Sequence, residues 1–105
     1  MKRMPAILAV VIVTIAAFPL AADDAATLYK SKCAMCHGAT GAGDTPMGKK
    51  LAIKNLGSPD VQKNNDEKLQ QVIAKGSGKM PPFGTKLSEA QIKQLVALVR
   101  AFAKK

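Results

Sequence analysis

Five consecutive residues hold both cysteines and the only histidine of this chain. They read Cys33-Ala34-Met35-Cys36-His37, so two residues separate the thiols and the imidazole follows the second thiol directly. On one helical turn, two thiols at this spacing can each add to a vinyl group of the same porphyrin, and the next residue then presents its imidazole to the iron from the same side. C-x-x-C-H is the attachment pattern of a c-type haem. The pentapeptide therefore predicts one covalently attached haem c.

Three other kinds of site use two cysteines at this spacing. A disulfide between Cys33 and Cys36 would close a very short loop and constrain the chain little. A thioredoxin-like redox pair needs a βαβ context, and no strand pattern of useful length is present. A zinc or copper site would be one ligand short, because two cysteines and one histidine do not complete a tetrahedron. These remain the alternatives to haem.

A haem iron bound by His37 either takes a second protein ligand or keeps an open position. Met80 lies in the stretch GKMPPFG, whose prolines and glycines exclude a helix and favour a stiff loop that can hold a thioether over the iron. Met47 lies in a second plausible loop, whereas Met35 is inside the attachment segment and cannot reach the opposite face. Methionines also fill gaps in cores. We expect Met80 as the second ligand, with Met47 or an open site as alternatives.

The N-terminal 22 residues have the pattern of a secretory signal. Lys2 and Arg3 precede an apolar run that breaks at Pro19 and ends in small residues at Ala22. We expect cleavage after Ala22, with a cut after Ala21 as runner-up, and an uncleaved membrane anchor as the alternative because the run is about long enough to span a bilayer. Loss of the two cations lowers the formal net charge from +9 to +7. Residues 23–105 then form one exported, periplasmic domain, and haem attachment also occurs outside the cytoplasm.

The rest of the chain predicts a helical wrapper. Apolar spacing and capping residues predict helices over residues 23 to about 31, from 58 for one or two turns, from 65 or 66 to about 75, and from 88 to the C-terminal end. Ser88 and Gln91 form a capping box for the last helix. Residues 38–48 are glycine-rich and are predicted to be a loop.

The predicted core is small for an independent domain. Only three aromatic side chains remain after residue 22, namely Tyr29, Phe83 and Phe102. A domain of this size with few large side chains has a marginal core and often needs a cofactor. Our hypothesis is that the haem supplies the missing apolar volume and that the haem-free chain is largely unfolded.

The segments around Cys33–Gly38, Gly41–Gly43 and Lys79–Phe83 resemble class I c-type cytochromes, closest to the small bacterial mono-haem cytochromes of the c6, c551 and c555 kind. The resemblance implies an all-α fold, the small cytochrome c fold, with three to five short helices wrapped around one haem. It implies haem thioethers at Cys33 and Cys36, with His37 and Met80 as the iron ligands. One departure is Ala25, which stands where the family usually has a glycine at the crossing of the terminal helices. The backbone carbonyl that would orient the second ring nitrogen of His37 is not identifiable from the sequence.

The resemblance implies a one-electron carrier rather than an enzyme, with no substrate. Basic charge without aromatic interleaving, on an exported chain, argues against nucleic-acid binding. We expect a monomer whose partners are acidic-surfaced redox proteins or membrane oxidoreductase complexes, steered by lysines around an exposed haem edge. The lysines expected there are Lys49, Lys50, Lys79 and Lys86. The alternatives are a five-coordinate haem protein that binds small ligands or reacts with peroxide, and a haem-free metal chaperone.

Overall fold

The computed structural model describes residues 9–12 and 24–103. Its helical elements, in chain order, are α1 (Ala25–Leu28), a π-helical turn η1 (Tyr29–Cys33), α2 (Ala34–His37), α3 (Pro46–Lys50), α4 (Pro59–Gln62), α5 (Asp66–Lys75) and α6 (Glu89–Phe102). Because α1, η1 and α2 follow one another without a break, the described residues contain five continuous helical segments. Those residues contain no strand, only an isolated antiparallel bridge between Ser77 and Met80. The expected all-α fold is confirmed.

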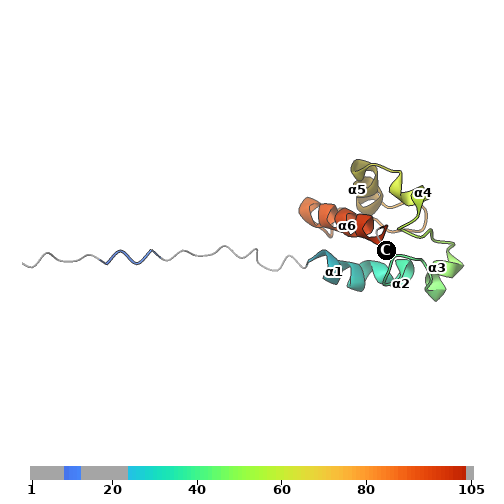
Figure 1. Ribbon diagram of the computed structural model, residues 1–105, viewed down its shortest axis with the longest axis horizontal. Helices are drawn as coiled ribbons and strands as arrows, with labels where there is room; N and C mark the ends of the chain where they lie inside the picture. The colour runs from blue at the N-terminus through green and yellow to red at the C-terminus, as the bar shows by residue number, and fades with distance from the viewer. Residues whose placement is uncertain (1–8, 13–23, 104–105) are drawn as a thin grey trace, which may run out of the picture.

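Helix α6 lies between the two halves of the molecule. The row of α1, η1 and α2 runs along one side of it, and α5 packs on another side (Figure 1). Ile92 and Leu95 of α6 join a core cluster with Leu28 and Tyr29 of the first segment. Further along α6, other buried side chains form a second cluster with Leu69 of α5. The spacing of three and four residues predicted from the sequence thus gives α6 two neighbouring apolar stripes, one for each partner.

The predicted beginnings of α4, α5 and α6 are confirmed. Pro59 is the first residue of α4 and follows the N-cap Ser58. The side chain of Asn65 accepts a hydrogen bond from the Lys68 amide at the start of α5. The capping box of α6 is formed in both directions, between Ser88 and Gln91. The caps of α5 and α6 are formed as hydrogen bonds, whereas the Ser58 side chain makes no capping bond and Pro59 marks the start of α4.

Two predicted boundaries are wrong. The first helical segment does not end near residue 31 but continues to His37, because the wider π-helical turn η1 carries it into the attachment motif. The predicted loop over residues 38–48 contains the start of α3. Thr45 caps this helix by accepting a hydrogen bond from the Gly48 amide, and Pro46 occupies its first turn. Met47 consequently lies on a helix rather than in a loop.

The alanine at the expected crossing point does not keep the terminal helices apart. Ala25 is partly buried and packs against the larger core cluster. Helices α1 and α6 are in direct contact. Alanine is therefore small enough for this crossing.

The predicted signal segment, residues 1–22, lies outside the described residues apart from 9–12, which are exposed and belong to no helix or strand. Its cleavage after Ala22 stays a prediction. Among the helices of the described part of the chain, none has the length and apolar character needed to cross a bilayer.

Candidate haem site

Two adjoining cavities lie in the middle of the helical wrapper. Their volumes are about 430 Å³ and 520 Å³, each within the usual range for a small-molecule or cofactor site. Three of the four predicted site residues, Cys33, His37 and Met80, line both cavities, and Cys36 lines the second. The structure therefore brings together side chains that are up to 47 positions apart in the sequence and come from two separate segments.

Cys33 and Cys36 are free thiols that lie half-buried at the cavity edge. Cys33 is the last residue of η1, and Cys36 is in α2. Burial raises the pKa of the Cys33 thiol, with Lys32 acting in the opposite direction to a smaller extent. Both residues line the second cavity, so the two thiols border one space, the arrangement that covalent addition to one ligand requires.

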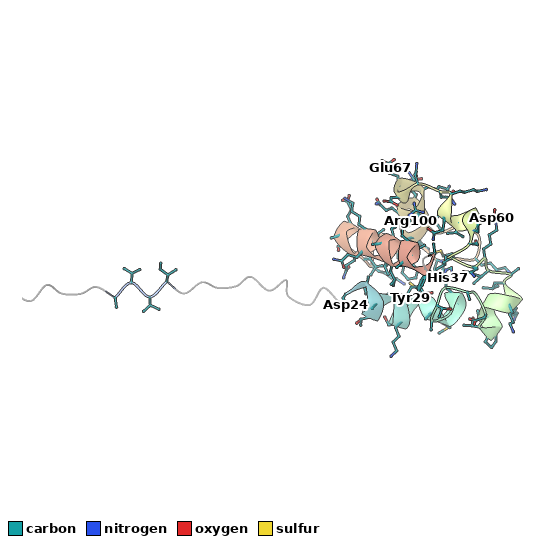
Figure 2. The ribbon with its side chains drawn as sticks, in the orientation of Figure 1. Asp24, Tyr29, His37, Asp60, Glu67 and Arg100 are labelled. Carbon is teal, nitrogen blue, oxygen red and sulfur yellow. The ribbon has the colours of Figure 1, made fainter. Side chains whose placement is uncertain are left out.

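His37 is the last residue of α2. In Figure 2, Tyr29 and His37 lie along the same row of helical segments, below α6 in the view. Burial lowers the pKa of the His37 imidazole, which favours the neutral form that binds metals. Its Nδ1 atom is buried and has no hydrogen-bond partner among the described residues. The sequence did not identify the backbone carbonyl that would accept a hydrogen bond from this atom, and the described part of the structure shows none in that position.

Met80 reaches the cavities from the loop that follows α5. The amide of Met80 donates to the Ser77 carbonyl over 2.9 Å, and the Ser77 amide donates to the Met80 carbonyl over 3.2 Å. After the two prolines, the amide of Phe83 donates to the carbonyl of Ile73 in α5 over 3.0 Å. These bonds fix the loop against the end of α5 and hold the thioether beside the cavity.

The other two methionines lie elsewhere. Met47 is 40% exposed on α3 and is absent from the lining of both cavities. Met35 is 74% exposed at the rim of the second cavity. Of the methionines considered for the second ligand, Met80 is the one whose position fits.

The expected lysines are only partly at the cavity mouth. Lys79 lines the second cavity, and the Nζ atom of Lys86 lies 6.0 Å from the ring centre of Phe83, which lines both cavities. Lys49 and Lys50 are exposed on α3 and line neither cavity. Lys32 and Lys54, which were not among the four, do line them, and Lys54 pairs with Asp60 at 3.2 Å. The position of Lys32 beside Cys33 is the sequence signal that could have identified it.

Part of the cavity wall could not be found from periodicity. Ile53 lines both cavities and Leu56 the first, and both belong to the irregular segment between α3 and α4. The preceding residue, Ala52, has a φ of 52°, a left-handed conformation that is uncommon for alanine. No helical or strand repeat marks such residues as buried.

The donor set and its surroundings fit a haem c. The site combines two thiols, one imidazole whose neutral form is favoured by burial, and one thioether with walls made largely of aliphatic side chains. Thiols and an imidazole in this order suit covalent attachment and proximal ligation, and a thioether is a common second ligand of cytochrome iron.

Comparisons with known proteins agree with this chemistry. The model of a family described as "Cytochrome C oxidase, cbb3-type, subunit III" matches residues 20–99. Cytochrome c6 of a Synechococcus species is 33% identical over 94% of this chain and 91% of that protein. Cytochrome c6 of a Picosynechococcus species is 34% identical over 94% of this chain and 92% of its own length. The solved structure of the KustC0563 c-type cytochrome superposes with a TM-score of 0.70 at 34% identity, covering 75% of this chain and 96% of that one. This chain belongs to the mono-haem c-type cytochromes related to cytochrome c6.

Proposed function

We propose that this chain is an exported one-electron carrier that holds one haem c by thioethers at Cys33 and Cys36, with His37 and Met80 as the iron ligands. The proposal rests on one observation: His37 and Met80 line the same two cavities as Cys33. His37 precedes α3 in the sequence, and Met80 follows α4. When bound, the haem supplies an iron that alternates between the ferric and ferrous states.

The protein's own residues set the conditions for that exchange. His37 is kept neutral by burial, so its lone pair is free for metal binding. The thioether of Met80 would serve as the second iron ligand and would favour a high potential. Aliphatic walls limit access of water, which raises the cost of the charged oxidised state relative to the reduced one. A thioether held beside the cavity favours a carrier over the five-coordinate alternative.

The surface beside the second cavity suits a redox partner with an acidic rim. Met35 gives this rim an exposed apolar contact, and Lys32 and Lys79 line the same cavity. Cations around an apolar centre steer an oppositely charged surface toward contact and raise the association rate. We infer that the partners are acidic-surfaced redox proteins or membrane oxidoreductase complexes, met by a monomer in the periplasm after removal of residues 1–22.

Electron exchange with small probes of opposite charge tests this function. Stopped-flow oxidation of the reduced protein by hexacyanoferrate(III), an anion, is expected to slow as ionic strength rises, and oxidation by the cation tris(phenanthroline)cobalt(III) is expected to accelerate. Lys79→Gln should reduce the rate with the anion several-fold. The matched control is Lys93→Gln, on α6, where the lysine pairs with Glu89 at 3.3 Å and lines neither cavity.

Docking at the second cavity would be contradicted if both substitutions changed the oxidation rate equally. It would also be contradicted if the rates with both probes were independent of ionic strength. A protein that accepts no electron reversibly would contradict the carrier function itself.

A further inference from the structure

Three consecutive carbonyl groups at the end of α2 are each held by a donor from outside that helix. The hydroxyl of Thr45 donates to the Cys36 carbonyl over 3.0 Å. The amide of Gly43 donates to the His37 carbonyl over 2.7 Å. The hydroxyl of Tyr29 donates to the Gly38 carbonyl over 2.5 Å. We call these three hydrogen bonds the carbonyl clamp.

The ring of His37 is held quite differently. Its Nδ1 atom is buried without a hydrogen-bond partner in the described part of the chain. A histidine that binds a metal usually gives its other ring N–H to an acceptor, and that bond sets the orientation of the ring. The main-chain carbonyls of Cys36 and His37, on either side of the ring, are both hydrogen-bonded. The hydrogen bonds that fix this residue in the described part of the chain are thus those to its main chain.

We propose that the carbonyl clamp positions the His37 imidazole for iron binding, with Tyr29 and Thr45 as the positioning residues. The proposal rests on the proposed role of His37 as iron ligand. A peptide plane on each side of His37 is fixed by a hydrogen bond to its oxygen, and together these planes set the direction in which the Cα–Cβ bond leaves the backbone. Rotation of the ring about that bond is then limited by the cavity walls.

Both hydroxyl donors are themselves fixed. The Tyr29 ring is 5% exposed and lies with its centre 5.2 Å from that of Phe102. Burial raises the pKa of Tyr29 to about 12, so its hydroxyl keeps the proton that it donates. The Thr45 hydroxyl also accepts a bond from the Gly48 amide over 2.9 Å, so one side chain caps α3 and ties it to α2. Neither donor can move without disturbing its own helix.

The space around Gly38 shows how closely this turn is fitted. Gly38 has a φ of 81°, and a Cβ atom built there would lie 2.5 Å from Oδ1 of Asp44. The chain must therefore turn sharply directly after His37, and the Tyr29 bond to the Gly38 carbonyl stabilises that turn.

The test compares hydroxyl deletions in the haem-containing protein. Tyr29→Phe and Thr45→Val each remove one bond of the clamp and keep most of the side-chain volume, and the double variant removes both. Thr45→Ser keeps the hydroxyl and serves as the rescue. The matched control is Ser31→Ala, which deletes a hydroxyl bonded to the Leu28 carbonyl in the same helical segment and outside the clamp. The measurements are the proton NMR shifts of the haem methyl groups in the oxidised protein, which depend on the orientation of the axial imidazole, and the midpoint potential.

We expect the pattern of methyl shifts and the potential to change in Tyr29→Phe and in Thr45→Val, and to change most in the double variant. Thr45→Ser and Ser31→Ala should keep the wild-type values. A double variant that is less stable but retains the wild-type methyl shifts and potential would overturn the proposal, because the hydroxyls would then be purely structural. Failure of the proposed function would instead be visible in the wild-type protein, as a spectrum without His37 and Met80 ligation.

Discussion

The two sides of the site are held in place by different means. On the His37 side, side-chain hydroxyls and one amide bind three consecutive carbonyls of α2. On the Met80 side, the loop is closed by a pair of backbone bonds between Ser77 and Met80 and depends on the left-handed conformation of Gly76, with a φ of 76°. One side is thus fixed mainly by bonds from side-chain hydroxyls, and the other by bonds between backbone groups. Substitutions should therefore disturb the two sides separately.

The difference has a consequence for redox chemistry. The proposed attachment residues Cys33 and Cys36 are close to His37 in sequence, within one continuous helical segment. The thioether comes from a loop that is held by backbone hydrogen bonds around Gly76, so it is the ligand that changes in the loop conformation can release. We expect the His37 side to govern assembly and the Met80 side to govern potential and ligand access.

The largest expected effect is unfolding of the haem-free chain, in which the His37 side and the Met80 side lose their structure together. Without haem, the two cavities of about 430 Å³ and 520 Å³ would lose the group that fills them, and unfilled apolar space destabilises a small domain of marginal stability. The Cys33→Ala/Cys36→Ala variant without haem should therefore show little helical circular dichroism and no cooperative melt. A sharp thermal transition in that material would refute the idea that haem completes the core.

The next largest effect is expected from Met80→Ala, which removes the thioether and leaves the His37 side intact. The haem should remain attached, the midpoint potential should fall, and the reduced protein should bind carbon monoxide rapidly. Stopped-flow carbon monoxide binding and a redox titration measure this. Met47→Ala is the control, since Met47 lines neither cavity, and a carbon monoxide response in that variant equal to that of Met80→Ala would reassign the ligand.

A smaller effect on the same side is expected from Gly76→Ala. A Cβ atom at this position would lie 2.5 Å from the Met80 carbonyl oxygen, whereas one at Gly78 would meet nothing within 4 Å. Both residues have positive φ, at 76° and 56°, so either substitution costs about 1–2 kcal/mol in backbone strain. Only Gly76→Ala should also displace Met80 and weaken the near-infrared band of thioether-to-iron charge transfer in the oxidised protein. Equal loss of that band in Gly78→Ala would mean that strain alone, rather than the contact with Met80, releases the ligand.

The smallest effect concerns the His37 side at high pH. Burial is the main cause that raises the pKa of Tyr29 from its ordinary value of 10.0 to about 12 in the folded protein. Between these values the folded chain binds more protons than the unfolded chain, so the stability linked to Tyr29 is fully present below about pH 10 and declines as pH rises toward 12. Urea unfolding of the reduced protein across this range should show the decline. Tyr29→Phe should lack this component, and identical pH profiles for the two proteins would contradict the assignment, because Tyr29 is the only tyrosine.

Residues that act through local chemistry were predictable from the sequence. The starts of α5 and α6 follow from caps within three or four residues of each helix start, and that of α4 from Pro59. The C-x-x-C-H spacing predicts Cys33, Cys36 and His37 as the attachment residues because that reaction needs those groups in that order. The prolines beside Met80 exclude a helix there, and the structure indeed has a loop at this position.

Features that depend on the folded chain were not predictable. The Tyr29 and Thr45 hydroxyls each reach a carbonyl nine residues away in sequence, and no propensity or periodicity encodes such a contact. The π-helical turn η1 follows from how the first segment must enter the attachment motif, since its residues alone suit an ordinary helix. The start of α3 was missed although Thr45 and Pro46 repeat the cap-and-proline pattern of Ser58 and Pro59, because the neighbouring glycines outweighed it.

The most direct test of the account is the visible spectrum of the mature protein made with haem-maturation machinery, recorded oxidised, reduced, and reduced under carbon monoxide. The account predicts a sharp α-band on reduction, a weak near-infrared charge-transfer band on oxidation, and no shift with carbon monoxide, as expected for iron bound by His37 and Met80. A reduced spectrum that shifts readily with carbon monoxide would contradict ligation by Met80, and a protein without any haem spectrum would contradict the account as a whole.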